Sequence, residues 1–309
     1  MKVYLSKINE SWIIDRVRDE WYEHCDDISS SKIKSADIVW IIAPWVLKNI
    51  NKKNLKNKKV ICSYYHFDFN NFSKTEFEIL DKYVDEYHVI SKKTEKDLKK
   101  LTNKKITSIP FWINQEKFFN IEDKENLRNL FGIKDDHYLV GSFQRDTEGS
   151  DLVSPKLIKG PDIFIEVVKS LYLKNNKTKV VLAGTRRQYV INALEDLNIP
   201  YIYYEMVSFD ILNKLYNLLD LYVVSSRIEG GPQAVLECAV SKTPIISTDV
   251  GVASEILSEK SIFSHHNLSQ LEISKVKPDI NFAFEKSMKY TLPNGVNLFK
   301  NMLSNLYES

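Results

Sequence analysis

The chain has 309 residues, of which 43% are hydrophobic and 27% charged, and its 43 basic and 41 acidic side chains leave a formal charge of +2. These proportions are typical of a globular protein and do not indicate a disordered, fibrous or nucleic-acid-binding chain. None of the nine glycines precedes Gly132, which excludes a glycine-rich Rossmann or Walker phosphate loop from the amino-terminal third.

Short apolar runs alternate with amphipathic stretches along the chain. The first part has strand candidates at residues 2–5, 37–42, 59–63, 86–90 and 105–109, with helical patterns at 11–23, 75–83 and 94–101. A break at 110–116 and a polar connector with a short helix at 120–129 follow. The alternation then restarts with strand candidates at 138–143, 179–183, 201–204, 219–224 and 244–247, and helical patterns at 161–173, 188–197, 209–218, 232–240 and 281–309, the last divided by Pro293.

This order predicts an α/β fold, with two Rossmann-like domains whose mostly parallel sheets face each other across a cleft. We place the amino-terminal domain at residues 1–115 and the carboxy-terminal domain at residues 116–285. Residues 286–309 are expected to form a carboxy-terminal helix that packs back on the amino-terminal domain. Because open α/β sheets bind ligands at the carboxyl ends of their strands, we looked for a site in the segments that follow strands.

The cellular compartment is predicted from three features that the sequence lacks: a disulfide framework, a signal peptide and a membrane-spanning run. Cys25, Cys62 and Cys238 have no C-x-x-C spacing, so they predict no disulfide framework and fit a reducing compartment. Residues 1–12 lack the apolar core of a signal peptide. The longest nearly apolar run, residues 38–47, is too short to cross a bilayer and is interpreted as a buried strand. We expect a cytoplasmic protein that is at most peripheral to the inner face of a membrane.

The most informative segment is a strand at 221–224 that leads through Glu229, Gly230 and Gly231 to Pro232, where a helix opens. The glycines leave no Cβ to block a ligand, and a helix start offers unpaired N–H groups to phosphate or sugar oxygens. Glu237 follows inside that helix, and two such carboxylates could accept hydrogen bonds from a polyol.

A plainer interpretation is that the Gly-Gly-Pro sequence is only a strand-to-helix turn and that both glutamates are surface charges. Against it, Glu237 interrupts the apolar run at 234–240. A carboxylate among buried neighbours needs a hydrogen-bonding partner, which favours a functional role.

The spacing from Glu229 to Glu237 resembles the E-x7-E signature of the retaining family-4 glycosyltransferases, which have the GT-B fold and use nucleotide sugars. Ser226 before it, and residues 243–247 with Gly251 after it, are similar to the family's flanking sequence. The resemblance is specific over about residues 140–260 and weaker before them.

The resemblance implies roles for several residues of this segment. Glu237 would bind the ribose diol of the donor, and Glu229 would contact hydroxyl groups of the transferred sugar. The backbone at Gly230, Gly231, Pro232 and Gln233 would hold sugar and phosphate oxygens. Met206 and Val207 fall where the family's loop contacts the nucleobase, which suits uridine or guanosine equally.

Two cations follow the strand at 138–143: Arg145, three residues after Ser142, and Lys159, just before Gly160. Cations at a strand end could stabilise a departing diphosphate. The family has an arginine and a lysine at the matching positions, and Ser142 lies on the same donor side. The family's usual spacing is shorter, so residues 146–158 are an insertion. The alternative is an ordinary salt-bridged surface pair.

The acceptor side departs from the family's common pattern. His66 follows the strand at 59–63, where it either packs among aromatic residues or, as the resemblance implies, donates a hydrogen bond to the donor sugar. Residues 9–12 occupy the place of a glycine-rich loop that this chain lacks. Arg186 and Arg187 follow another strand and are equally compatible with a structural role and with lining the cleft.

Lysine-rich stretches at 48–59 and 92–105 are either solvated faces or a surface for an anionic membrane or an acidic acceptor.

The resemblance as a whole implies a metal-independent, retaining hexosyltransferase. It would move a sugar from a UDP- or GDP-sugar to a hydroxyl of a glycan, lipid-linked or protein acceptor, in glycan or glycolipid synthesis. No D-x-D sequence is present, so we expect no metal, no other cofactor and no nucleic-acid partner. The alternative is a catalytically silent protein of the same fold that binds sugar nucleotides or glycans.

Overall fold

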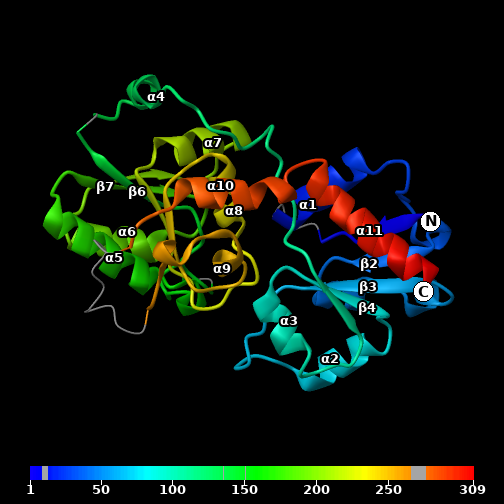
Figure 1. Cartoon of the computed structure of the whole chain (residues 1–309). Coiled ribbons are helices and arrows are strands. Elements are labelled where there is room, and N and C mark those ends of the chain that lie inside the picture. Colours follow the sequence, from blue (N-terminus) through cyan, green and yellow to red (C-terminus); the bar gives the residue numbers. More distant parts are fainter. Residues whose placement is uncertain (9–12, 135, 150, 266–275) are drawn as a thin grey trace. The chain divides into compact units, whose positions relative to one another are not determined.

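The computed structural model describes residues 1–8, 13–134, 136–149, 151–265 and 276–309. The chain forms two compact units (Figure 1). Unit 1 comprises Met1–Trp112 together with Lys289–Ser309, and unit 2 comprises Ile113–Met288. We had expected boundaries at residues 115 and 285. No helix in the described part of the chain is long and apolar enough to span a membrane.

Unit 1 contains a five-stranded sheet, and all its strands are parallel, as predicted. The strands follow the order β1 (Val3–Leu5), β2 (Ile38–Ile41), β3 (Lys59–Tyr64), β4 (Glu86–Val89) and β5 (Lys105–Ser108). The helices of this unit are α1 (Ile13–His24), α2 (Lys74–Asp81), α3 (Lys92–Leu98) and α11 (Asn294–Glu308). The first two residues of the helix expected at 11–23 lie outside the described residues.

Aromatic side chains pack helices against both faces of this sheet. On one face, Trp21 of α1 meets Trp40 of β2 with ring centroids 5.4 Å apart, and Phe299 of α11 stacks on Trp40 at 5.2 Å. On the other face, Phe77 of α2 stacks on Tyr87 of β4 at 6.0 Å. The carboxy-terminal helix α11 therefore belongs to the core of unit 1 (Figure 1).

One expectation about unit 1 is wrong. The apolar run at 38–47 is not a single buried strand, because β2 ends at Ile41 and Pro44–Asn49 forms the 3-10 helix η2. Pro44 has no N–H to donate to a sheet ladder, so the strand stops before it. Trp45 is consequently 42% exposed.

Unit 2 contains a second parallel sheet, with six strands in the spatial order β11-β10-β9-β6-β7-β8. Its strands are β6 (Tyr138–Ser142), β7 (Thr178–Ala183), β8 (Tyr201–Tyr204), β9 (Leu221–Val224), β10 (Ile245–Thr248) and β11 (Ile262–Phe263). The last of these was not predicted, since two residues are too few to show a pattern. The two parallel sheets confirm the predicted fold class.

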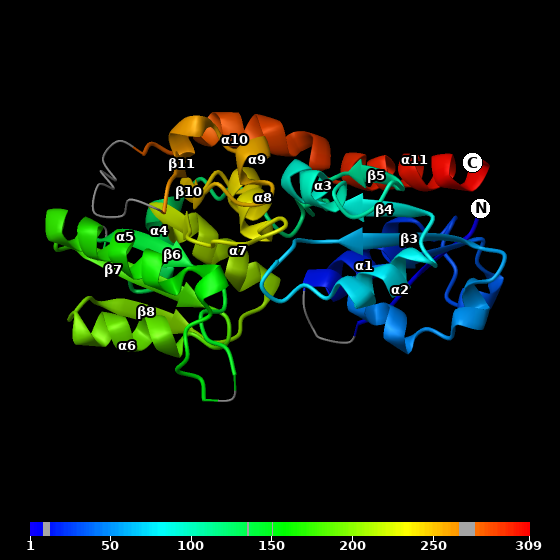
Figure 2. The ribbon, with the colours of Figure 1, turned by 90° about the horizontal axis from the view of Figure 1, so that it is seen from below.

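Seven helices of the described residues surround this sheet: α4 (Lys124–Leu130), α5 (Pro161–Lys174), α6 (Gln188–Asp196), α7 (Phe209–Leu218), α8 (Gln233–Val240), α9 (Ala253–Ile256) and α10 (Ile280–Ser287). Helices α5 and α6 share a hydrophobic core with Leu221 and Val223 of β9, whereas Tyr216 of α7 meets Tyr222 on the other face. Helix α10 lies beside α8 and α9 in both views (Figures 1 and 2).

Candidate functional site

The candidate site lies where the strand order of unit 2 reverses. Chain order runs outward from β6 through β7 to β8 and then returns to β9 on the opposite side of β6. The loops that follow β6 and β9 are therefore neighbours, which is the position where open α/β sheets bind ligands. Gln144 joins them, because its Nε2 donates to Lys159 O at 2.8 Å and its Oε1 accepts from Ser226 Oγ at 3.2 Å.

Lys159 and Glu229 form an ion pair at this point. Ser226 Oγ also donates to Glu229 Oε1, at 3.2 Å. Both partners of the ion pair are mostly buried, with 22% of the lysine side chain and 11% of the glutamate side chain exposed. The structure thus brings together two of the residues that the sequence predicted for catalysis.

Two glycines allow the loops of this site to approach each other closely. Gly160 has φ 61, and a Cβ there would lie 1.9 Å from Ser225 O. Gly251 has φ 48, and a Cβ there would lie 2.2 Å from Gly230 O. A larger residue at either position would push the two contacting backbone segments apart. Glycine is therefore required for Lys159 and the Gly230–Gly231 turn to lie where they do.

Glu237 is buried on α8, which begins at Gln233, one residue later than predicted. Tyr216 of α7 supplies the partner that a buried carboxylate requires, because its hydroxyl donates to Glu237 Oε2 at 2.7 Å. Burial and the charge of Glu237 raise the pKa of Tyr216 well above its usual value, so the phenol keeps its proton. Tyr216 was missed from sequence, where it is one of several apolar or aromatic residues in a helical pattern.

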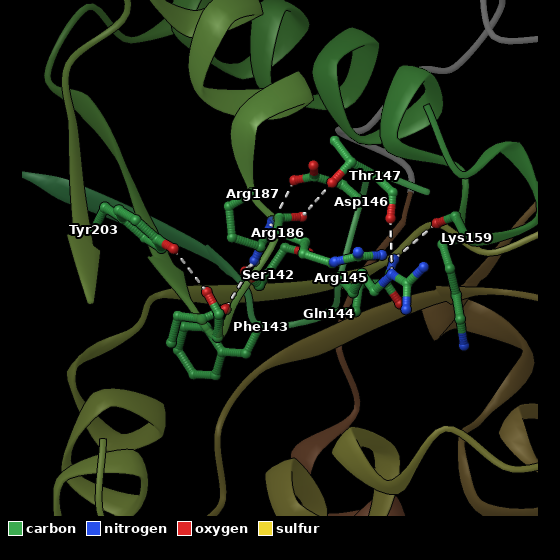
Figure 3. A network of polar contacts seen from close by, with 12 residues as sticks. Ser142, Phe143, Gln144, Arg145, Asp146, Thr147, Lys159, Arg186, Arg187 and Tyr203 are labelled. Carbon is green, nitrogen blue, oxygen red and sulfur yellow. Dashed lines mark hydrogen bonds and ion pairs between the residues drawn. The ribbon is translucent and has the colours of Figure 1, made fainter. Parts of the chain in front are cut away.

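The described residues of the segment 146–158, which the resemblance treats as an insertion, form a folded loop. Thr147 and Pro155 form an antiparallel bridge, and the Lys156 N–H donates to Asp146 O at 2.8 Å. Arg145 Nε donates to Thr147 O at 2.7 Å, inside the same loop. The carbonyl of Arg186 accepts from the N–H of Asp146 at 3.0 Å, which ties the loop to the end of β7 (Figure 3).

This loop adds a cation that sequence reasoning overlooked. Burial lowers the pKa of Lys156, and the charges of Arg145 and Lys159 lower it further. Burial and the charge of Arg186 lower the pKa of Arg145 in the same way. Lys156 therefore lies close enough to Arg145 and Lys159 for their positive charges to oppose its own, although the charges of Glu148 and Glu229 act in the opposite direction. Neighbouring cations of this kind are suited to an anion. Lys156 was missed because it lies in a segment treated as an insertion.

Arg187 has a structural role. It is 1% exposed, and its Nε pairs with Asp146 Oδ2 at 2.8 Å. Its Nη1 donates to Ser142 O and, at 3.0 Å, to Ala183 O, so it joins the ends of β6 and β7 (Figure 3). Of the two roles left open for Arg187, the structure supports the structural one. Ser142 is buried, and its contact with a ligand stays a prediction.

The remaining predicted residues lie elsewhere. Met206, in the loop between β8 and α7, is 72% exposed, and the contact of Met206 and Val207 with a nucleobase stays a prediction. His66 belongs to unit 1, where it lines a pocket, so its hydrogen bond to a donor sugar also stays a prediction. Residues 9–12 lie outside the described residues. No group of three His, Cys, Asp or Glu side chains suited to a metal occurs in the described part of the chain.

Two Rossmann-like units with parallel sheets define the GT-B fold class, and solved structures agree. A crystal structure of Anabaena Alr3699/HepE in complex with UDP and glucose is similar with a TM-score of 0.75 and 11% identity, covering 98% of this chain and 99% of that one. Sucrose-phosphate synthase from Thermosynechococcus elongatus gives 0.70 and 13%, covering 97% and 80% of the two chains. At these identities the likeness establishes the fold alone.

Sequence comparison points to the same class of protein. Residues 154–271 match the family model of the Glycosyl transferases group 1, and this segment contains Lys159, Glu229 and Glu237. The uncharacterized glycosyltransferase MJ1607 of Methanocaldococcus jannaschii is 27% identical over 143 residues. The match covers 45% of this chain and about a third, 34%, of that protein.

Proposed function

We propose that this chain is a retaining glycosyltransferase of the family-4 type that transfers a sugar from a UDP- or GDP-sugar to a hydroxyl group of an acceptor. The observation that carries the proposal is the convergence of Lys159, Glu229 and Ser226 where the strand order of unit 2 reverses. The family match to residues 154–271 supports it, as does the similarity to a protein solved with UDP and glucose.

The buried carboxylate of Glu237 serves the ribose diol in this proposal. An ionised carboxylate accepts hydrogen bonds from two neighbouring hydroxyl groups without donating any. The bond from Tyr216 fixes its orientation, so that less freedom is lost when the nucleotide binds.

The Lys159–Glu229 ion pair has to be exchanged when a donor binds. Lys159 then turns to the diphosphate, and Glu229 accepts hydrogen bonds from hydroxyl groups of the sugar. Glu229 is therefore a positioning residue that contacts the substrate, and the reaction requires no protein nucleophile.

Transfer breaks the bond between the sugar's anomeric carbon and the diphosphate oxygen, which leaves with the electron pair. The acceptor hydroxyl oxygen bonds to the same carbon on the same face, and its proton passes to the departing phosphate oxygen. Arg145, Lys156 and Lys159 supply the positive charge that stabilises the diphosphate as it leaves.

A nucleotide-release assay tests the proposal. The purified chain is incubated with a panel of UDP- and GDP-sugars, and free UDP or GDP is measured by chromatography. We expect slow release from one donor, with the released sugar in the donor's anomeric configuration by NMR. Glu237→Ala should abolish nucleotide binding, and Glu229→Gln should lower the rate more than the affinity. Glu195→Gln, at an exposed carboxylate of α6, is the matched control.

Two outcomes would contradict the proposal. Nucleotide binding that depends on Glu237 without any release would favour the silent binding protein. Absence of nucleotide binding would exclude the transferase and a silent sugar-nucleotide-binding protein, and would leave only glycan binding.

A further inference from the structure

Unit 1 contains a cavity of about 590 Å³, the pocket that His66 lines. Its size lies in the range of small-molecule pockets, about 300–1,000 Å³. Its lining combines residues of η2, Lys52, Tyr64 at the end of β3, the loop that follows β3, and residues of α2. The apolar side chains of the lining include Trp45, Leu47, Phe67, Phe72, Phe77 and Leu80.

The aromatic wall of this pocket is held in place by contacts among its own rings. Tyr64 stacks on Phe67 with centroids 4.4 Å apart and meets the edge of Phe77 at 6.1 Å. Phe72 lies 5.7 Å from Phe67 and 6.0 Å from Phe77. Rings that brace one another have few alternative rotamers, so the pocket is formed before a ligand arrives.

The polar groups of the lining are mostly engaged with the protein itself. Lys52 Nζ donates to Leu47 O at 2.6 Å, and Asp68 Oδ2 accepts from Asn71 Nδ2 at 2.7 Å. A hydroxyl group placed against the aromatic wall would have no partner there, which costs about 1–3 kcal/mol for each group. A hydrocarbon chain has no such groups, and its burial is favourable.

The surroundings of the pocket combine exposed apolar side chains with lysines. Trp45 and Ile79 are lining residues that remain 42% and 46% exposed, and Phe69, which contacts Phe67 at 5.7 Å, is 56% exposed. Lys48, also a lining residue, is exposed at the start of the lysine-rich stretch 48–59. The lining also contains the carboxylates of Asp68, which is hydrogen-bonded to Asn71, and Glu76. Apolar side chains beside cations are typical of surfaces that meet the headgroups and chains of anionic lipids.

We propose that this pocket binds the hydrocarbon chain of a lipid whose anionic headgroup lies beside Lys48. Binding of the lipid does not depend on the proposed function. Only the further statement that this lipid is the acceptor rests on the proposed function. The class of acceptor would then be a lipid-linked hydroxyl compound, with its chain held by the aromatic wall and its head near the end of β3.

Dodecyl phosphate, used below its micelle-forming concentration, is a direct probe. Binding is measured by calorimetry and by the fluorescence of Trp45, with Trp45→Phe to assign the spectral change. Ile79→Glu puts a charge in the pocket lining, and Tyr83→Glu puts the same charge at an exposed residue outside the lining, just beyond α2. We expect Ile79→Glu to weaken binding at least tenfold and Tyr83→Glu to leave it unchanged.

A second pair of variants tests the headgroup. Lys48→Gln should weaken dodecyl phosphate several-fold, whereas Lys56→Gln, in the same lysine-rich stretch but outside the lining, should not. Inorganic phosphate alone should neither bind nor compete. The inference is overturned if the wild-type chain does not bind dodecyl phosphate, if both glutamate variants behave alike, or if inorganic phosphate displaces the probe.

This test and the nucleotide-release assay fail separately, because lipid binding is measured without a donor. Lipid binding without nucleotide release would refute the proposed function and leave the lipid site intact. Nucleotide release by a chain that does not bind dodecyl phosphate would do the reverse.

Discussion

The hydroxyl of Tyr216 on α7 donates a 2.7 Å hydrogen bond to the buried carboxylate of Glu237 on α8. Two helices on the same face of the unit 2 sheet therefore share one polar contact beneath the proposed donor site. Because Glu237 is only 6% exposed, water cannot readily replace this donor. The strength of the contact can be measured directly.

Removing that hydroxyl should cost both stability and affinity. We expect Tyr216→Phe to lower the free energy of unfolding by about 1–3 kcal/mol, because the carboxylate loses a buried donor. UDP or GDP affinity should fall several-fold, as measured by calorimetry. Tyr201→Phe removes a similar tyrosine–glutamate bond of 2.8 Å, to Glu195, at an exposed position and should change neither quantity. Equal effects of the two variants would contradict the role of Tyr216.

Lys156 should contribute to binding of the diphosphate and not of the nucleoside. We expect Lys156→Gln to weaken UDP or GDP binding about tenfold, which corresponds to about 1.4 kcal/mol. Its affinity for the nucleoside should be unchanged, and the salt dependence of diphosphate binding should decrease. Lys177→Gln is the control, because this lysine pairs with Asp136 at an exposed position. An equal loss of nucleoside affinity would show that Lys156 acts only on the fold.

A comparison of Gly160 with Gly132 separates two contributions to the free energy of unfolding. One is the strain of a positive φ, and the other is the clash of a Cβ with a neighbouring backbone segment. Both glycines have positive φ, 61 and 65, but a Cβ at Gly132 meets no atom within 4 Å whereas one at Gly160 lies 1.9 Å from Ser225 O. We expect Gly132→Ala to lower the free energy of unfolding by about 1 kcal/mol. Gly160→Ala should cost at least about 2 kcal/mol more and should also weaken nucleotide binding, by displacing Lys159. Urea titration and calorimetry would measure the two effects, and similar results for both variants would refute the close approach.

His88 should make the stability of unit 1 depend on pH. Burial lowers its pKa to about 4 although the bond to Ile109 O opposes the shift, so the folded chain holds it neutral. Since the unfolded chain takes up the proton near pH 6.5, the free energy of unfolding should fall by up to about 3 kcal/mol as pH drops from about 6.5 to 4. His88→Gln should remove this component from urea titrations, whereas His24→Gln, at an exposed residue, should retain it. An unchanged pH profile in His88→Gln would contradict the assignment.

The sequence was sufficient to predict most strands, because central parallel strands such as β2 and β9 are buried at every residue and appear as apolar runs. β8 (Tyr201–Tyr204) and α7 (Phe209–Leu218) begin and end at the predicted residues. Errors arose where a single residue interrupted an apolar run or where an element was too short to show a period. Pro44 divides the apolar run at 38–47, and β11 is too short to have a period.

The site was only partly predictable, for a different reason. Glu229 stands out because it lies beside two glycines after the buried strand β9. Lys159 stands out because it precedes Gly160 where the resemblance to the family implies a lysine. Tyr216 and Lys156 do not stand out, because their importance depends on which residues they meet in space. A tyrosine in a helix and a lysine in a loop are ordinary until the fold places them beside Glu237 or Arg145.

The position of α11 in the core of unit 1 has a consequence for the order of assembly. Residues 113–288, a continuous segment, are synthesised before this helix, which completes a unit whose sheet was made first. At a synthesis rate of about 5–20 residues per second, Phe299 is made about 10–40 s after the last strand of the unit 1 sheet. The face around Trp40 is not covered by Phe299 during that time. During translation, the first unit to emerge from the ribosome is thus the last to finish folding.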